Sequence, residues 1–160
     1  MNFLVVCVGL PGSGKSTCAN NSSIADKVFS SDEYRGLLYG DENDQTHNKE
    51  VFNKLYEDMI SYLTENDNKI VIFDATNLTI RTRKFLFDRI KNTRDNLHVS
   101  ATVFNSSVDV CIERDSLRGK NGGRSVGEKV IRRMNESFEF PTKEEGFDLV
   151  LTMESDECWR

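Results

Sequence analysis

The chain has 160 residues and a formal net charge of −5, and 38% of its residues are hydrophobic and 29% charged, which suits one globular domain with a sizeable core. No apolar run is long enough to span a membrane, and the net negative charge excludes a surface that attracts nucleic acid as a whole. The N-terminus lacks the basic segment of a secretory signal, so we expect a single domain over residues 1–160 that stays in the cytoplasm without a membrane partner.

The first predicted strand, an apolar run over residues 3–8, leads directly into Gly-Leu-Pro-Gly-Ser-Gly-Lys-Ser-Thr at 9–17. This segment matches the Walker A pattern G-x-x-x-x-G-K-[ST], whose glycines let backbone N–H groups curl around phosphates. Lys15 is expected to reach the outer phosphates and Ser16 to offer its hydroxyl to Mg²⁺, while a helix beginning near Lys15 directs its positive end at the same anion. The sequence therefore predicts a site for a nucleoside triphosphate, ATP, with Mg²⁺. The expected nucleotide-binding residues are Gly12, Ser13, Gly14, Lys15, Ser16 and Thr17.

Polar residues follow the second predicted strand, 27–30, where the chain reads Ser-Asp-Glu-Tyr-Arg at 31–35. Ser31 is a suitable N-cap for the helix that follows. Asp32 could take the proton of an acceptor hydroxyl during phosphoryl transfer, and Arg35, one turn later, could hold an acceptor phosphate through two hydrogen bonds. Position alone also allows a simpler interpretation, in which Asp32 only stabilises the helix N-terminus and Arg35 is a solvated side chain.

A third predicted strand, 69–73, is apolar throughout, as in a parallel sheet covered on both faces, and it is followed by Asp74. This is the position of a Walker B-type carboxylate, so Asp74 is expected to support Mg²⁺, through water or through Ser16, or to orient Arg35. ATP-hydrolysing motors commonly have a second acidic residue at the next position, where this chain has Ala75, and this counts against a motor ATPase.

The rest of the chain alternates between helical and strand patterns. The clearest helix, over 47–65, has apolar residues at a spacing of three and four that defines one buried face. A Ser-x-x-Glu capping box at 125–128 is expected to begin a helix after the glycine-rich loop 119–123, and Pro141 to end that segment. The other helices are expected over 31–39, 80–91 and 107–117, and the other strands over 97–104 and 147–151.

This alternation predicts an α/β protein with a three-layer P-loop NTPase fold, in which a parallel sheet of about four to five strands has helices on both faces. Functional groups in such a sheet collect at the carboxyl ends of the strands. The residues that follow the first three strands are therefore expected to face one cleft.

Three arginines, Arg114, Arg118 and Arg124, border the glycine-rich loop. Mobile arginines that close over phosphates neutralise the charge that develops during phosphoryl transfer. We therefore expect a basic lid near 114–125 that helps to bind the nucleotide, the alternative being a solvated basic helix end.

Charge is unevenly distributed along the sequence. Residues 81–94 carry six basic side chains and one acidic side chain, and residues 113–133 carry seven basic and three acidic side chains. Residues 41–67, by contrast, carry two basic and eight acidic side chains. Such blocks are usually solvated faces, and the two basic blocks could also form a docking surface for an anionic substrate.

The order of four motifs resembles the kinase module of phage 5′-polynucleotide kinases over nearly the whole chain. The motifs are the Walker A segment, Ser-Asp-Glu-Tyr-Arg at 31–35, Asp-Ala-Thr-Asn-Leu-x-x-x-x-Arg at 74–83 and Glu-Arg-Asp-Ser-x-Arg-Gly at 113–119. The resemblance implies that Asp32 is the general base for a 5′-hydroxyl and that Arg35 binds the 3′-phosphate of the acceptor.

The same resemblance implies that Lys15 and Ser16 bind ATP and magnesium and that Arg118 is the lid arginine on the ATP phosphates. Asp74 would support this arrangement, with Thr76 and Asn77 beside it. The phosphatase domain that the phage enzymes commonly carry, with its D-x-D-x-T motif, has no counterpart in this sequence. The lid is also longer and richer in glycine, so that Arg124 competes with Arg118 for the lid role.

Three functions remain open at this point. A polynucleotide 5′-hydroxyl kinase predicts basic segments along an entrance wide enough for a strand, although aromatic residues for base stacking do not interleave them. A small-molecule kinase acting on a sugar, nucleoside or antibiotic hydroxyl predicts the same catalytic residues and a closed acceptor pocket. A nucleotide-dependent switch protein is the third, and the guanine-reading N-K-x-D motif of GTPases is absent from the sequence. No oligomeric state is predicted.

Overall fold

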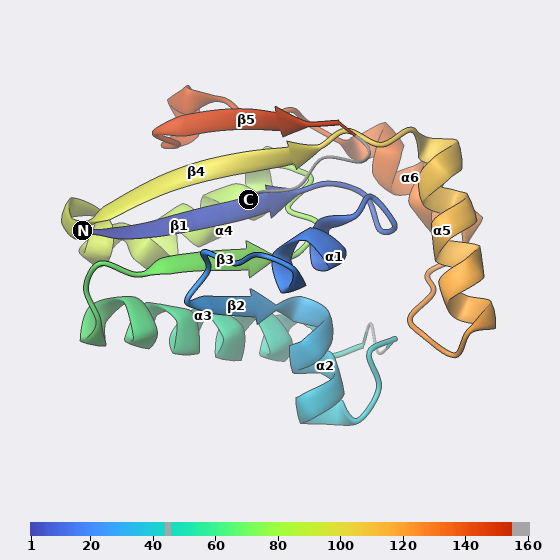
Figure 1. The fold of residues 1–160 in the computed structure, drawn as a ribbon, viewed down its shortest axis with the longest axis horizontal. Helices are drawn as coiled ribbons and strands as arrows, with labels where there is room; N and C mark the ends of the chain where they lie inside the picture. Colours follow the sequence, from blue (N-terminus) through green and yellow to red (C-terminus); the bar gives the residue numbers. More distant parts are fainter. Residues whose placement is uncertain (44–45, 155–160) are drawn as a thin grey trace.

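The computed structural model describes residues 1–43 and 46–154, which form a five-stranded parallel sheet with helices on both faces (Figure 1). The order of the strands in the sheet is β2-β3-β1-β4-β5, and each neighbouring pair is parallel. The predicted α/β class and P-loop fold are therefore confirmed. The strands are β1 (Asn2–Val8), β2 (Lys27–Ser30), β3 (Ile70–Asp74), β4 (Leu97–Phe104) and β5 (Leu149–Met153).

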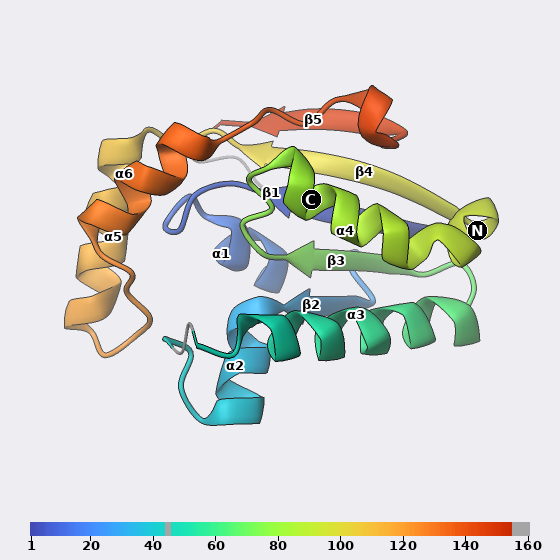
Figure 2. The same ribbon diagram turned by 180° about the vertical axis from the view of Figure 1, so that it is seen from behind.

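Two long helices, α3 (Asn48–Glu65) and α4 (Ile80–Ile90), cover one face of the sheet (Figure 2). The main hydrophobic core lies between them and the strands, and it includes Leu4 and Val6 of β1 and Leu55 of α3, all fully buried. Complete burial of an aliphatic side chain of this size stabilises the fold by about 1.5–3 kcal/mol. The apolar stripe predicted over 47–65 is thus part of the core.

The opposite face of the sheet carries the short helix α1 (Lys15–Asn20), which packs through a smaller cluster that includes Ala19 and Ile72. Helix α2 (Ser31–Tyr39) continues from β2, while α5 (Val108–Lys120) and α6 (Glu128–Ser137) lie beyond the carboxyl ends of the strands (Figure 1). Short 3-10 helices span Lys91–Asn96 and Lys143–Glu145. Within residues 1–43 and 46–154, no helix is both long and apolar enough to cross a membrane.

The N-cap of α2 is Ser30, one residue before the predicted position. The Oγ atom of Ser30 accepts a hydrogen bond from the backbone N–H of Glu33 at 3.3 Å. Ser31 is instead buried in the first turn of the helix. Either serine satisfies the sequence pattern, and the end of β2 decides between them because Ser30 keeps the extended backbone that a cap requires.

The predicted capping box at 125–128 is wrong, and so is the predicted extent of the glycine-rich loop. Helix α5 continues through Lys120. Helix α6 begins at Glu128, and its N-cap residue is Gly127, which has a φ angle of 90° and no side chain to cap the helix. The Oγ of Ser125 donates instead to a carboxylate oxygen of Asp115, at 2.9 Å. A tertiary hydrogen bond has therefore replaced the local capping bond.

Candidate active site

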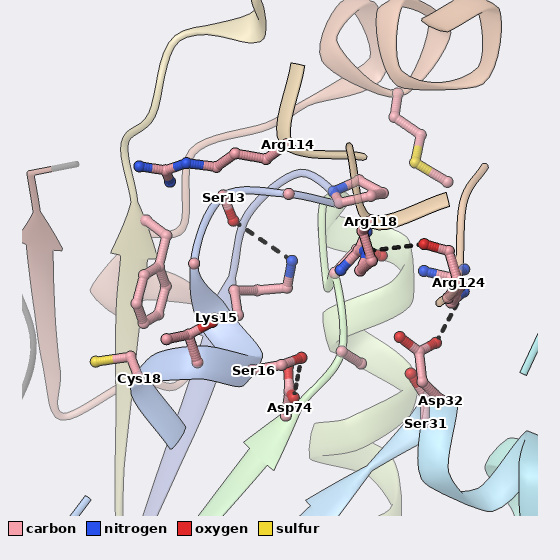
Figure 3. A pocket seen from close by; sticks show the side chains of 18 of the residues that line it. Ser13, Lys15, Ser16, Cys18, Ser31, Asp32, Asp74, Arg114, Arg118 and Arg124 are labelled. Atoms are coloured by element: carbon pink, nitrogen blue, oxygen red, sulfur yellow. Dashed lines mark hydrogen bonds and ion pairs between the residues drawn. The ribbon is translucent and has the colours of Figure 1, made fainter. Parts of the chain in front are cut away.

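A cavity of about 710 Å³ lies at the carboxyl ends of the strands (Figure 3). Because β2, β3 and β1 are neighbours in the sheet, the segments that follow them open into the same space, as predicted. Helices α5 and α6 contribute the far wall. All the predicted site residues line this cavity, namely Gly12, Ser13, Gly14, Lys15, Ser16, Thr17, Asp32, Arg35, Asp74, Arg114, Arg118 and Arg124.

The P-loop after β1 depends on glycine at two positions with a left-handed backbone. The φ angles of Gly12 and Gly14 are 80° and 100°. A Cβ atom on Gly12 would lie 2.4 Å from the carbonyl oxygen of Cys111, because the loop packs directly against the backbone of α5. The backbone N–H of Gly9 donates to the carbonyl oxygen of Thr76 at 3.0 Å, which ties the start of the loop to the end of β3.

The ammonium group of Lys15 is buried inside this loop. Its Nζ donates to the carbonyl oxygen of Leu10 at 2.7 Å and lies 3.4 Å from the Oγ of Ser13. Burial lowers the pKa of Lys15, and the nearby carboxylate of Asp74 opposes that shift. A phosphate would compete well for this group, because hydrogen bonds between two ionised partners are stronger than those to a neutral carbonyl.

Ser16 and Asp74 form the oxygen pair predicted for magnesium. The Oγ of Ser16 donates to Oδ2 of Asp74 at 2.7 Å. Burial raises the pKa of the Asp74 carboxyl, and Lys15 partly offsets this effect. In the described part of the chain, no group of three or more His, Cys, Asp or Glu side chains could enclose a metal. The pair still fits Mg²⁺, which proteins usually hold through one or two side chains together with phosphate oxygens and water.

Asp32 lies at the opposite side of the cavity from the P-loop (Figure 3). Its Oδ1 atom is 2.6 Å from Nη1 of Arg35 and 3.1 Å from Nε of Arg124. Among the described residues, Oδ2 of Asp32 accepts no hydrogen bond. One oxygen of the carboxylate is thus anchored, while the other remains available to a ligand.

Arg35 is buried, so the interpretation as a solvated side chain is wrong. Its Nε and Nη2 atoms both donate to Oδ1 of Asn48 at 3.1 Å, and its guanidinium lies over the ring of Phe52, 5.8 Å from the centroid. Asn48 and Phe52 also line the cavity and were not predicted as site residues. Phe52 belongs to the apolar pattern of α3, which indicates core packing, and no motif marks Asn48.

The three lid arginines are distributed across the cavity (Figure 3). Nη1 of Arg114 approaches to 3.9 Å from the position a Cβ would have on Gly14, so Arg114 is on the P-loop side. Nε of Arg118 donates to the carbonyl oxygen of Arg124 at 2.7 Å, and Arg124 reaches Asp32. The three predicted lid arginines therefore reach both sides of the cavity.

Asp115 organises the loop between α5 and α6, and the sequence had not identified it as important. Its buried carboxylate accepts hydrogen bonds from the backbone N–H groups of Val126 and Gly127 and from the hydroxyl of Ser125, at 2.9–3.0 Å. Nη2 of Arg118 is also 3.3 Å from it. Burial raises the pKa of Asp115, but these hydrogen bonds outweigh burial and hold the pKa below its usual range.

Thr76 and Asn77, expected beside Asp74, have different positions. Thr76 lines the cavity. Asn77 is buried with φ of 48°, and its Nδ2 donates to the carbonyl oxygen of Cys7 at 2.9 Å, which holds the turn after β3 against β1. Asn77 thus supports the scaffold beneath the site.

The parallel sheet, its strand order and the P-loop at the end of β1 define a P-loop kinase-like α/β fold. The chain belongs to the AAA domain family, whose model matches residues 4–141. The match includes the P-loop, all three lid arginines and the proposed magnesium pair.

Solved structures with the same fold include several kinases. Kti12 from Chaetomium thermophilum, determined with ADP-AlF3, has a TM-score of 0.70 at 17% identity, covering 96% of this chain and 89% of that one. A fungal RNA kinase has a TM-score of 0.62 at 17% identity, covering 98% of this chain and 77% of that one. A gluconokinase from Sinorhizobium meliloti has a TM-score of 0.58 at 16% identity, covering 96% of this chain and 82% of that one. At such identities these likenesses establish the fold alone, and at that level the resemblance to polynucleotide kinases is confirmed.

Proposed function

We propose that this chain is an ATP-dependent phosphotransferase that transfers the γ-phosphate to a hydroxyl, most readily the 5′-hydroxyl of a polynucleotide. The observation that carries the proposal is the position of Asp32 and Arg35 across one cavity from Lys15 and Ser16. Direct transfer requires an acceptor oxygen in line with the γ-phosphate and a base within hydrogen-bond reach of its proton. A P-loop on one side of a cavity and an anchored carboxylate on the other support such an arrangement.

On the donor side, the backbone N–H groups of the P-loop and the ammonium of Lys15 would hold the β- and γ-phosphates. Ser16 and Asp74 would hold Mg²⁺, which, when bound, neutralises negative charge on the phosphate oxygens. Arg114 and Arg118 would neutralise the charge that develops on the transferred group.

On the acceptor side, Arg35 would orient the substrate, and the available Oδ2 of Asp32 would take the hydroxyl proton. A bond then forms between the acceptor oxygen and the γ-phosphorus, while the bond from that phosphorus to the β–γ bridging oxygen breaks and ADP leaves. Arg35 beside Asp32 suits an acceptor that carries a phosphate close to its hydroxyl. The motif order and the fold shared with a fungal RNA kinase support a polynucleotide as that acceptor.

The second candidate is a small-molecule kinase, and the closure of the acceptor end favours it. The backbone N–H of Ser125 donates to Oδ1 of Asn43 at 3.1 Å, so the loop after α5 meets the segment after α2 next to Arg124. One arginine of the basic block on α4 is also unavailable to a substrate, because Arg83 is fully buried against Glu145. A strand that entered between these two loops would need them to separate. A gluconokinase shares this fold.

Labelled ATP distinguishes these candidates. The protein is incubated with γ-labelled ATP, Mg²⁺ and separate 5′-hydroxyl DNA and RNA oligonucleotides, nucleoside 3′-phosphates, sugars and nucleosides. We expect label on oligonucleotides and on nucleoside 3′-phosphates. Efficient label on one small metabolite and none on any oligonucleotide would establish the second candidate, and the absence of label from every hydroxyl would contradict the kinase activity.

A further inference from the structure

Two arginines converge on one carboxylate oxygen at the acceptor end of the cavity. Arg35 comes from α2 and approaches Oδ1 of Asp32. Arg124 comes from the loop between α5 and α6 and approaches the same oxygen (Figure 3). Their side chains are only 7% and 9% exposed. Two nearly buried guanidinium groups therefore share one carboxylate oxygen at this end of the cavity.

The Nε atom of Arg124 lacks a satisfactory partner. It lies 3.1 Å from Oδ1 of Asp32, yet within the described residues this buried nitrogen makes no hydrogen bond, because the ion pair is not aligned for one. A buried guanidinium N–H without a hydrogen bond is costly, and an acceptor oxygen brought beside it would relieve this cost. The contact with Asp32 is therefore one that a better-placed anion can replace.

The backbone around Arg124 is fixed on the acceptor side. Its carbonyl oxygen accepts from Nε of Arg118, and the next residue, Ser125, is held both by Asn43 and by Asp115. The side chain therefore projects toward Asp32 from a well-supported loop, at the opposite end of the lid from Arg114.

From this arrangement we infer that Arg124 is an acceptor-specificity residue, which forms with Arg35 a two-arginine subsite for a phosphate that the acceptor carries next to its reacting hydroxyl. The inference rests on the proposed function and deepens it. It moves Arg124 from the nucleotide-binding lid, where the sequence placed it, to the acceptor side. When the acceptor phosphate binds, it takes over the N–H groups of Arg124, and this loosens the hold on the Asp32 carboxylate that must accept the hydroxyl proton.

Steady-state kinetics of Arg124→Gln test the inference with nucleoside 3′-phosphates and matched 3′-hydroxyl nucleosides as acceptors. We expect the KM for the 3′-phosphate to rise about tenfold to a hundredfold, as for the loss of a hydrogen bond between charged partners, while the KM for ATP changes less than about twofold. The preference for the 3′-phosphate over the 3′-hydroxyl should fall by the same factor, and Arg124→Lys should restore part of it.

Two further variants make the comparison specific. Arg114→Gln, on the P-loop side, should raise the KM for ATP and spare that for the acceptor. Arg133→Gln removes the same charge from the exposed surface of α6 and should leave both values unchanged. The inference is overturned if Arg124→Gln raises the KM for ATP instead, or if it reduces kcat/KM equally for acceptors with and without the phosphate, as a merely structural role would.

Calorimetric binding of a nucleoside 3′-phosphate separates this inference from the proposed function. If the wild-type protein binds the compound and Arg124→Gln does not, the subsite stands even where no phosphate is transferred, and only the proposed reaction fails. If wild-type transfer is efficient and binding of the 3′-phosphate does not depend on Arg124, the subsite is wrong while the proposed function stands. No binding to the wild-type protein overturns the subsite.

Discussion

Gly12 and Gly122 have nearly the same left-handed backbone, with φ angles of 80° and 83°, but different surroundings. A Cβ on Gly12 would lie 2.4 Å from the carbonyl oxygen of Cys111, whereas a Cβ on Gly122 would have no atom within 4 Å. Gly122→Ala should therefore cost only the backbone penalty, about 1–2 kcal/mol, and leave ATP affinity unchanged. Gly12→Ala should also displace the P-loop from α5 and reduce ATP affinity more than about tenfold. Thermal unfolding and ATP calorimetry on both variants provide the check, and equal losses of affinity would contradict this account of the loop.

Asp32 and Glu33 are adjacent carboxylates in the first turn of α2, and only Asp32 lines the cavity. Asp32→Asn keeps the shape of the side chain but removes the proton acceptor, so the transfer rate should fall by about 10²–10⁴-fold with ATP affinity nearly unchanged. Glu33→Gln should leave both intact, although it removes a similar charge from the same helix turn. Transfer at the wild-type rate in Asp32→Asn would show that this carboxylate only stabilises the helix.

Single site residues could be predicted where they belong to a contiguous motif or directly follow a predicted strand. The P-loop is contiguous, so its pattern identifies it, and Asp74 and Asp32 are found because strands end there. Asn48 and Phe52 escaped prediction because they come from the start of α3, whose apolar spacing indicates core packing. The contact of Arg124 with Asp32 could not be predicted, because sequence order does not show which side of the cavity a lid side chain reaches.

At the scale of elements, the loop between α5 and α6 depends on Asp115. Asp115→Ala leaves the buried backbone N–H groups of Val126 and Gly127 without their acceptor, and each lost hydrogen bond to the carboxylate is worth about 1.5–3 kcal/mol. We expect these two amides to lose protection in hydrogen exchange. Asp109→Ala removes an exposed carboxylate from the same helix and should leave the protection unchanged. Full protection in Asp115→Ala would mean that other contacts hold the loop.

The same carboxylate predicts a dependence on pH. Because the folded pKa of Asp115 is lowered, the stability it contributes is complete above its unfolded pKa, about 3.9, and is lost as pH falls through the lower folded value. The difference in free energy of unfolding between the wild type and Asp115→Asn should therefore be constant above about pH 5 and shrink below about pH 4. Urea unfolding at a series of pH values measures it, and a difference that grows toward acid would contradict this sign.

The boundaries of elements were predicted well where local signals agree with the tertiary structure. The strands and α3 follow from their apolar periods, whereas the start of α6 does not follow from its capping box. Ser125 and Glu128 satisfy that pattern, but the hydroxyl of Ser125 has a buried acceptor in Asp115 that lies ten residues earlier in the chain. Long-range partners of this kind leave no local trace in a sequence.

At the scale of the whole molecule, the sequence predicted the α/β fold and a cleft at the carboxyl ends of the first three strands. It did not predict which basic side chains form ion pairs within the fold and which line the cavity. Two arginines of the basic block 81–94 form ion pairs within the fold, Arg83 with Glu145 and Arg94 with Asp148, while Arg81, Lys84, Arg89 and Lys91 are exposed. The arginines that line the cavity come instead from α2, from α5 and from the loop before α6. A count of charges along the sequence cannot distinguish arginines that form ion pairs within the fold from arginines that line the cavity.

The P-loop and Asp32 line one cavity. The proposed phosphotransferase activity therefore requires direct transfer from ATP to a hydroxyl while both substrates are bound. Initial rates with ATP and a 5′-hydroxyl oligonucleotide varied together test this most directly, alongside γ-labelled ATP given without an acceptor. We predict intersecting double-reciprocal lines, as expected for a complex of three components, and no label on the protein. Parallel lines with a labelled protein, or ATP hydrolysis with no transfer to any hydroxyl, would contradict it.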